Sequence, residues 1–257
     1  MAAPQITTLL HVEGLRVSYG ARQVISGFKI DLASQSCTAI VGSSGCGKST
    51  MLGALVGLLP ATAGNGWLGE EQFMQAGALT VHPWSLRRQI SLVTQQPGLL
   101  PQRTMLQNLT LAMHLVLGDK KDQTLSRVHE ITAMLGIETH LNAYPNQLSG
   151  GQLQRAHLAR ALVLNPKILL LDEVTSNVDP RTSEAIVGAL AGLRQKQGIS
   201  IILVTHDFAA VKHLADTVIF LHEGRNFEEL PSRDFPDGFK TVEAAAFARQ
   251  PVEQEPR

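Results

Sequence analysis

Residues 42–50 carry the clearest chemical pattern in this chain. They read GSSGCGKST, a complete match to G-x-x-x-x-G-K-[ST], and they follow the short β-branched run CTAIVG. The residues after Lys48 are apolar at helical spacing until Pro60. A strand, a glycine loop and a helix in this order favour a phosphate-binding loop over a chance glycine-rich turn. Its backbone N–H groups would wrap a phosphate, and its lysine would add positive charge. The predicted phosphate-binding residues are Gly42, Ser43, Ser44, Gly45, Cys46, Gly47, Lys48, Ser49 and Thr50, and the Ser49 hydroxyl is also a predicted ligand of Mg²⁺.

A second glycine turn, LSGGQ at residues 148–152, opens a predicted helix that ends before Asn165 and Pro166. The N-terminus of a helix is itself an anion site, because its free N–H groups and its dipole favour negative charge. Two such loops cannot both serve one nucleotide within a single copy. The pair therefore predicts that the chain works together with another copy.

A pair of carboxylates ends the apolar run ILLLDE at residues 168–173, which has the composition of a central parallel strand. Parallel sheets bind ligands at the carboxyl ends of their strands, and Asp172 lies at that position. Asp172 is predicted to hold Mg²⁺ through water, and Glu173 to polarise an attacking water. A purely structural strand end remains the alternative for this motif taken alone.

The run LSGGQLQR, placed just upstream of ILLLDE, resembles the signature of the ATP-binding cassette ATPases. The resemblance covers residues 12–224 and implies ATP and Mg²⁺ as ligands. It also implies that Ser149 and Gly151 of a second copy close the site around the γ-phosphate. By position it assigns adenine stacking to Tyr19, a sensor of Mg²⁺ and water to Gln95 (with Gln96 as the alternate), communication across the dimer to Asp179, and contact with the γ-phosphate to His206. The residues that the resemblance adds to the nucleotide site are Tyr19, Ser149, Gly150, Gly151, Gln152 and Asp179, and the catalytic set becomes Glu173, His206 and Gln95.

Each residue added by the resemblance also has a structural explanation when taken alone. Tyr19 could be a turn aromatic, Gln95 a polar residue at a strand end, and His206 a helix-capping or surface histidine. Asp179 precedes Pro180 and could cap the next helix, with or without a second role. Their joint order along the chain favours the functional interpretation.

The composition restricts the possible partners. The 257 residues hold 22 Lys plus Arg and 22 Asp plus Glu, so no basic field predicts nucleic-acid binding. No apolar run approaches the roughly 20 residues needed to cross a bilayer, and the only cysteines are Cys37 and Cys46. The resemblance therefore implies a peripheral subunit on the cytoplasmic face of the inner membrane. Its implied partners are a second ATPase copy (identical or homologous), separate membrane-spanning subunits and, as a further candidate, a substrate-binding protein.

The resemblance favours an importer, closest to the amino-acid-uptake ATPases. A separate-chain exporter, a lipid-handling ATPase, or a soluble member of the superfamily acting in DNA repair or translation remain alternatives. Against the soluble class, the interval between the two glycine loops has no heptad run, and the chain carries one cassette.

The predicted fold class is α/β: a P-loop NTPase core with a mostly parallel sheet, an antiparallel β subdomain and an α-helical subdomain. We expect one domain over residues 1–235, with the helical subdomain at about 96–150. We expect a polar, loosely ordered tail over residues 236–257, because that segment is rich in polar residues and proline.

Overall fold

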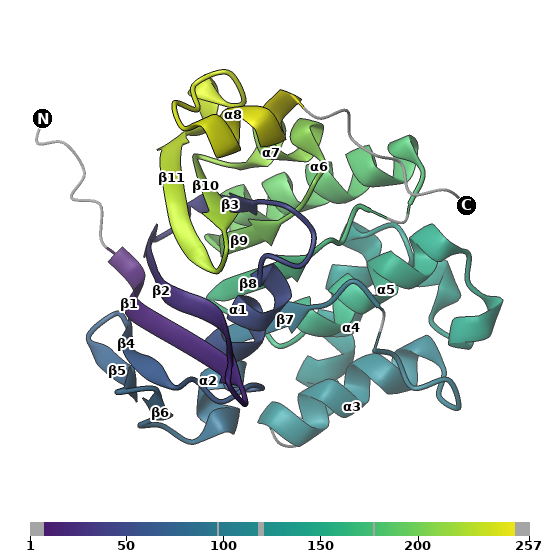
Figure 1. Cartoon of the computed structure of the whole chain (residues 1–257). Helices are drawn as coiled ribbons and strands as arrows, with labels where there is room; N and C mark the ends of the chain where they lie inside the picture. Colours follow the sequence, from purple (N-terminus) through teal and green to yellow (C-terminus); the bar gives the residue numbers. More distant parts are fainter. Residues whose placement is uncertain (1–7, 97, 118–120, 177, 250–257) are drawn as a thin grey trace, which may run out of the picture.

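A six-stranded sheet forms the centre of the computed structural model, which describes residues 8–96, 98–117, 121–176 and 178–249 (Figure 1). The strand order is β11-β10-β3-β9-β8-β7. The five strands from β10 to β7 run parallel, and β11 adds one antiparallel edge. Their bounds are β3 Cys37–Val41, β7 Ile90–Val93, β8 Ile168–Asp172, β9 Ser200–Val204, β10 Thr217–His222 and β11 Arg225–Pro231.

A second, antiparallel sheet covers one face of the central sheet, with helix α1 (Lys48–Leu55) sharing the same core. Its order is β2-β1-β4-β5-β6, with β1 Thr8–Tyr19, β2 Arg22–Ala33, β4 Ala63–Leu68, β5 Glu71–Gln75 and β6 Ala78–Leu79. Strand residues alternate between faces. Ile40 of β3 therefore packs with Met51 and Leu55 of α1, whereas its neighbours Ala39 and Val41 belong to the core on the opposite face.

Helices cover the opposite face of the central sheet (Figure 1). This layer holds α3 Met105–Leu117, α4 Lys121–Met134, α5 Gly150–Leu162, α6 Pro180–Gln197, α7 Phe208–Leu214 and α8 Val242–Arg249. The short α2, Pro83–Gln89, leads instead into β7. Within the described part of the chain, no helix combines the length and apolarity needed to cross a membrane.

The predicted fold class is confirmed, while several boundaries differ from the prediction. Helix α1 ends at Leu55, before the Pro60 to which the apolar spacing extends, because Gly57 adopts a left-handed conformation at φ 64°. Strand β7 stops at Val93, two residues before Gln95. The glycine-rich segment at 61–82, which shows no clear periodicity, forms β4, β5 and β6. The boundaries proposed for the helical subdomain remain predictions.

The expectation of a loosely ordered tail from residue 236 is wrong for its first half. Phe239, Ala244 and Phe247 are buried in the same core as α6 and α7, and α8 occupies residues 242–249. A few apolar side chains at suitable spacing anchor this segment despite its polar average. Residues 250–257 lie outside the described part.

Candidate functional site

The phosphate-binding loop lies between β3 and α1, as the sequence predicts. Gly47 caps α1 in a left-handed conformation with φ 107°, and a Cβ atom there would lie 2.7 Å from Cδ1 of Ile25 on β2. Only glycine fits both conditions. The loop therefore passes close under the antiparallel sheet and leads directly into the first turn of α1.

Lys48 lies inside the loop that it is predicted to serve. Its side chain is buried, and its Nζ donates hydrogen bonds to the carbonyl oxygens of Gly42 (2.7 Å) and Ser43 (3.0 Å). The ammonium group is therefore held at the turn where a phosphate would be wrapped. Charge-assisted hydrogen bonds from such a group to phosphate are stronger than those between neutral partners.

Ser49 and Asp172, which are about 120 positions apart in the chain, lie near enough for the Ser49 hydroxyl to influence the pKa of the Asp172 carboxyl. Burial raises the pKa of Asp172, and the Ser49 hydroxyl and Lys48 oppose that shift. Among the described residues, none forms a hydrogen bond with the buried Oδ1 of Asp172, so this atom is available to a ligand. A hydroxyl and one carboxylate fit Mg²⁺, which usually takes one or two protein ligands and completes its shell with water and phosphate oxygens. These two residues would hold the ion.

Glu173 and His206 form a pair beside this metal-binding set. The Oε1 atom of Glu173 lies 2.9 Å from Nε2 of His206, and both carboxylate oxygens are buried without accepting a hydrogen bond. Strands β8 and β9 are neighbours with Asp172 opposite Val204, which brings the residues that follow each strand together. Glu173 also adopts a left-handed conformation at φ 53°, a strained geometry that is concentrated at functional sites.

Gln95 is exposed and lies two residues beyond β7, at the same sheet edge as Glu173. No hydrogen bond between Gln95 and the other predicted site residues occurs in the described part of the chain. The next segment is tied to α5, because Arg160 donates a hydrogen bond to the carbonyl oxygen of Gly98. Gln96, the alternate assignment, is exposed as well.

The signature residues form the N-terminus of α5. The Ser149 hydroxyl accepts from the backbone N–H of Gln152, and the Gln152 side chain accepts from the N–H of Ser149, which is a complete capping box. Ser149 and Gly150 are exposed, and Gly151 is half-buried. In the described structure no hydrogen bond links residues 148–152 to the phosphate-binding loop of the same copy.

The signature instead contacts the start of α6. A Cβ atom on Gly151 would lie 2.7 Å from Cγ2 of Thr182. Asp179 caps α6, accepting from the N–H of Thr182 at 3.1 Å and from its hydroxyl at 2.6 Å. The Thr182 hydroxyl lowers the pKa of Asp179. The capping interpretation of Asp179 is thus confirmed, and its predicted role across a dimer stays a prediction. Its neighbour Asn177 lies outside the described residues.

The polar residues that hold the His206 loop were not among the residues predicted from the sequence. Ser183 of α6 donates a hydrogen bond to Asp207 at 2.9 Å, and the Asp207 backbone N–H donates to the Thr205 hydroxyl at 2.9 Å. Asp207 also caps α7. Consecutive residues of α6 therefore contact the signature (Thr182) and the histidine loop (Ser183). A serine in the first turn of a helix is too common in sequences to have predicted the contact between Ser183 and Asp207.

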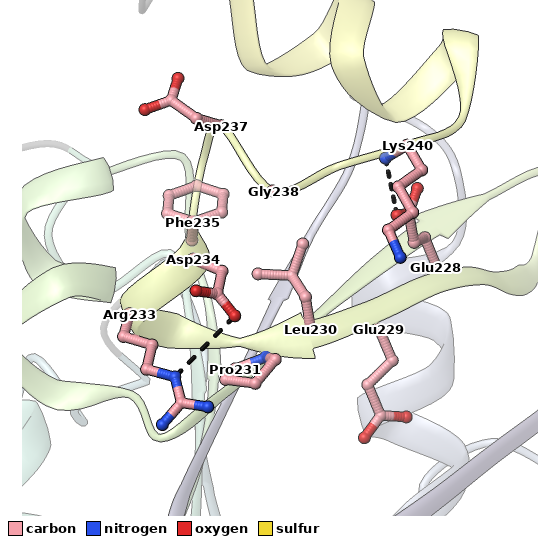
Figure 2. Close-up of a pocket in the computed structure, with 10 residues that line it drawn as sticks. All are labelled: Glu228, Glu229, Leu230, Pro231, Arg233, Asp234, Phe235, Asp237, Gly238 and Lys240. Atoms are coloured by element: carbon pink, nitrogen blue, oxygen red, sulfur yellow. Dashed lines mark hydrogen bonds and ion pairs between the residues drawn. The ribbon is translucent and has the colours of Figure 1, made fainter.

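Tyr19 ends β1 at the turn into β2 and is 53% exposed, so its ring is free to stack on a ligand. The same β2 strand brings Ile25 against Gly47 of the phosphate-binding loop. A separate hollow of about 600 Å³ is lined by ten residues between Glu228 and Lys240, none of which is a predicted site residue (Figure 2).

The fold and site define a class of protein: a P-loop nucleotide-binding protein with two adjacent carboxylates, Asp172 and Glu173, at the end of a central parallel strand. A family model described as "ABC transporter" matches residues 25–176, more than half of the chain. The chain belongs to the ABC transporter family, and the resemblance stated from its motifs is confirmed.

Curated relatives show which kind of ABC transporter protein this chain resembles. The methionine import ATP-binding protein MetN of Caulobacter vibrioides is 35% identical over 210 residues, which cover 82% of this chain and 62% of the relative. MetN of Lactobacillus delbrueckii subsp. bulgaricus is 37% identical over 216 residues, covering 82% of this chain and 61% of the relative. The chain thus spans a little over 60% of the length of these relatives. Their names agree with the expected likeness to amino-acid-uptake ATPases.

Solved structures agree with the fold. The cbiO1 protein of Clostridium perfringens, part of the ABC transporter complex cbiONQ, matches with a TM-score of 0.78 at 28% identity, covering 89% of this chain and 90% of that one. An ATP-binding cassette in a dimeric, post-hydrolysis state with ADP and Pi matches with a TM-score of 0.76 at 29% identity, covering 88% and 100%.

Proposed function

We propose that this chain hydrolyses ATP as the nucleotide-binding subunit of a membrane transporter and works as a pair of ATPase copies. The observation that carries the proposal is the separation of two phosphate-binding elements. Lys48, Asp172 and Glu173 gather at the carboxyl ends of the parallel strands, whereas Ser149 caps a helix and forms no hydrogen bond to these residues within the part of the chain that the structure describes. A matching structural neighbour is itself a dimer with ADP and Pi.

In the proposed reaction, positioning and charge neutralisation do most of the work. Lys48 and the N–H groups of the loop hold the β- and γ-phosphates, and Ser49 and Asp172 hold Mg²⁺, which supplies neutralising charge when bound. The Glu173 carboxylate orients water for in-line attack and accepts its proton. His206, 2.9 Å from that carboxylate, contacts the γ-phosphate from the side.

The second copy completes the site in this proposal. Ser149, Gly150 and Gly151 of the partner cover the outer side of the γ-phosphate, and the dipole of α5 adds positive potential there. Gln152 and Asp179 support that contact, Tyr19 stacks on adenine, and Gln95 senses the metal and water. ATP would hold the two copies together, and hydrolysis would release them, giving an open–closed cycle.

The partners are proposed from the relatives. MetN proteins are named for methionine import, so we propose import driven through separate membrane-spanning subunits, from a peripheral position on the cytoplasmic face. Methionine and related amino acids are the first cargo to test. The alternative is a soluble ATPase of the same superfamily, with no membrane partner.

Isolation from membranes in mild detergent tests the proposal. We expect a membrane-spanning protein to co-purify with this chain and the complex to hydrolyse ATP. The matched control is Lys48→Ala, which should retain the membrane partner and lose ATP hydrolysis. Recovery of an active chain without any membrane partner would favour the soluble alternative. Full hydrolysis by Lys48→Ala would contradict the site itself.

A further inference from the structure

The segment after β11 folds back over the loop that carries His206. Phe235, Phe239 and Phe247 are buried (4%, 7% and 8% exposed), and Ala244 is fully buried. Glu228 of β11 anchors the segment, because its carboxylate accepts hydrogen bonds from the backbone N–H groups of Lys240 (2.7 Å) and Thr241 (3.0 Å). Figure 2 shows the Lys240–Glu228 contact at the entry to α8. The helix is therefore fixed to the sheet at its start.

Aromatic contacts connect α8 to the histidine loop. The ring of Phe247 lies 6.4 Å from that of His206 and 6.0 Å from that of Phe208, measured between centroids. Phe208 in turn meets Phe235 edge-on at 4.8 Å. The loop from His206 to Phe208 thus packs against the C-terminal segment, while Asp207 is held by Ser183 of α6.

The His206 ring lies near the Glu173 carboxylate and the Phe247 ring. Its side chain is 40% exposed, and its Nε2 points to Glu173 at 2.9 Å without hydrogen-bond alignment. Packing must therefore contribute to holding the imidazole in place, and the Phe247 ring supplies such a contact. A misplacement of about 1 Å at a reacting group can cost roughly 100-fold in rate.

We infer that α8 positions the His206 imidazole through Phe247, so that Phe247 is a positioning residue for the phosphate-site histidine. This inference deepens the proposed function and rests on it for its effect on ATP turnover. The contact itself is independent of turnover, so it can be measured separately.

The experiment compares Phe247→Ala and Phe247→Leu with Val242→Ala, a large-to-small change on the same helix at a side chain that is 80% exposed. We expect Phe247→Ala to lower kcat about 10-fold or more with KM for ATP within about twofold. Phe247→Leu should recover part of the loss, and Val242→Ala should match the unaltered chain. A merely structural role would lower the amount of folded protein without this split between kcat and KM.

Histidine-labelled NMR gives the second measurement. Because the Phe247 ring lies near His206, we expect both Phe247 variants to shift and broaden the His206 ring signals, and Val242→Ala to leave them unchanged. Unshifted His206 signals, or unchanged kcat in a folded Phe247→Ala, would overturn the inference. If the unaltered chain does not hydrolyse ATP, the proposed function fails, and the NMR shifts alone decide whether α8 positions His206.

Discussion

Replacing Gly151 by alanine should separate the packing role of the signature from its proposed contact with a second copy. The added Cβ would lie 2.7 Å from Cγ2 of Thr182, about 1 Å closer than an ordinary carbon–carbon contact. Overpacking of this kind costs about 1–3 kcal/mol. The helix preference of alanine over glycine returns up to about 1 kcal/mol.

Gly150→Ala is the matched control, because a Cβ at Gly150 meets nothing within 4 Å in the same helical turn. The gain in helix preference largely cancels between the two variants. We therefore expect Gly151→Ala to be less stable than Gly150→Ala by about 1–3 kcal/mol. Urea denaturation of the nucleotide-free protein measures this difference.

A second substitution tests the cause of that cost. Thr182→Ala removes the crowding methyl group and leaves a Cβ contact of 3.4 Å, but it also removes the hydroxyl that donates to Asp179. The double variant should therefore be about as stable as Thr182→Ala alone. We expect it to remain defective in ATP-driven dimerisation, since the proposed contact requires close approach of the bare glycine backbone to the partner nucleotide. Equal stability of Gly151→Ala and Gly150→Ala would refute the packing argument. Full dimerisation of the double variant would refute the contact with the second copy.

The other predictions concern a thiol, a buried histidine and the general base. Cys46 is half-buried in the phosphate loop, and burial raises the pKa of its thiol, so its alkylation should become faster as pH rises. ATP should protect the protein from inhibition by thiol reagents, and Cys46→Ser should resist that inhibition. Unchanged inhibition of Cys46→Ser would point to Cys37 or another group. Burial, followed by the nearby Arg160, lowers the pKa of His157 to about 4. The unfolded chain therefore takes up a proton between pH 6.5 and 4 that the folded chain does not, and stability should fall by about 2 kcal/mol from pH 7 to pH 5. His157→Gln should lack this loss in urea titrations, and an identical pH dependence in both proteins would rule out His157 as its source. Glu173→Gln should bind ATP, lose most turnover and accumulate as a dimer on size exclusion, whereas normal hydrolysis would remove Glu173 from the proposed role.

The sequence predicts the elements of the site that are local in the chain. The phosphate loop, the helix that begins at Ser149 and the strand ending in Asp172 each lie within a few residues, and the structure forms all three. His206 and Gln95 required the family resemblance, because a single histidine or glutamine has no local signature. A short motif also does not show which copy of the chain holds the nucleotide that its signature contacts.

Long-range side-chain contacts could not be predicted. Thr182 beside Gly151, Ser183 bonded to Asp207, and Phe247 near His206 each join segments whose approach depends on the packed sheet and helices. Helix α8 was not predicted either, because the segment after residue 235 is polar on average. The burial of this segment depends on a few aromatic residues rather than on its overall composition.

Mixing two inactive variants tests the central claim most directly, namely that each active site is shared between two copies. One variant carries Lys48→Ala with an intact signature, and the other carries Ser149→Arg with an intact phosphate loop. A mixed dimer then contains one site with an intact loop and an intact signature, although neither parent contains any. We predict that each mixed dimer hydrolyses ATP at up to about half the rate of the unaltered dimer, because one of its two sites is complete. The activity of the mixture should rise in proportion to the number of mixed dimers formed. Mixed dimers that form and remain inactive would contradict a shared site.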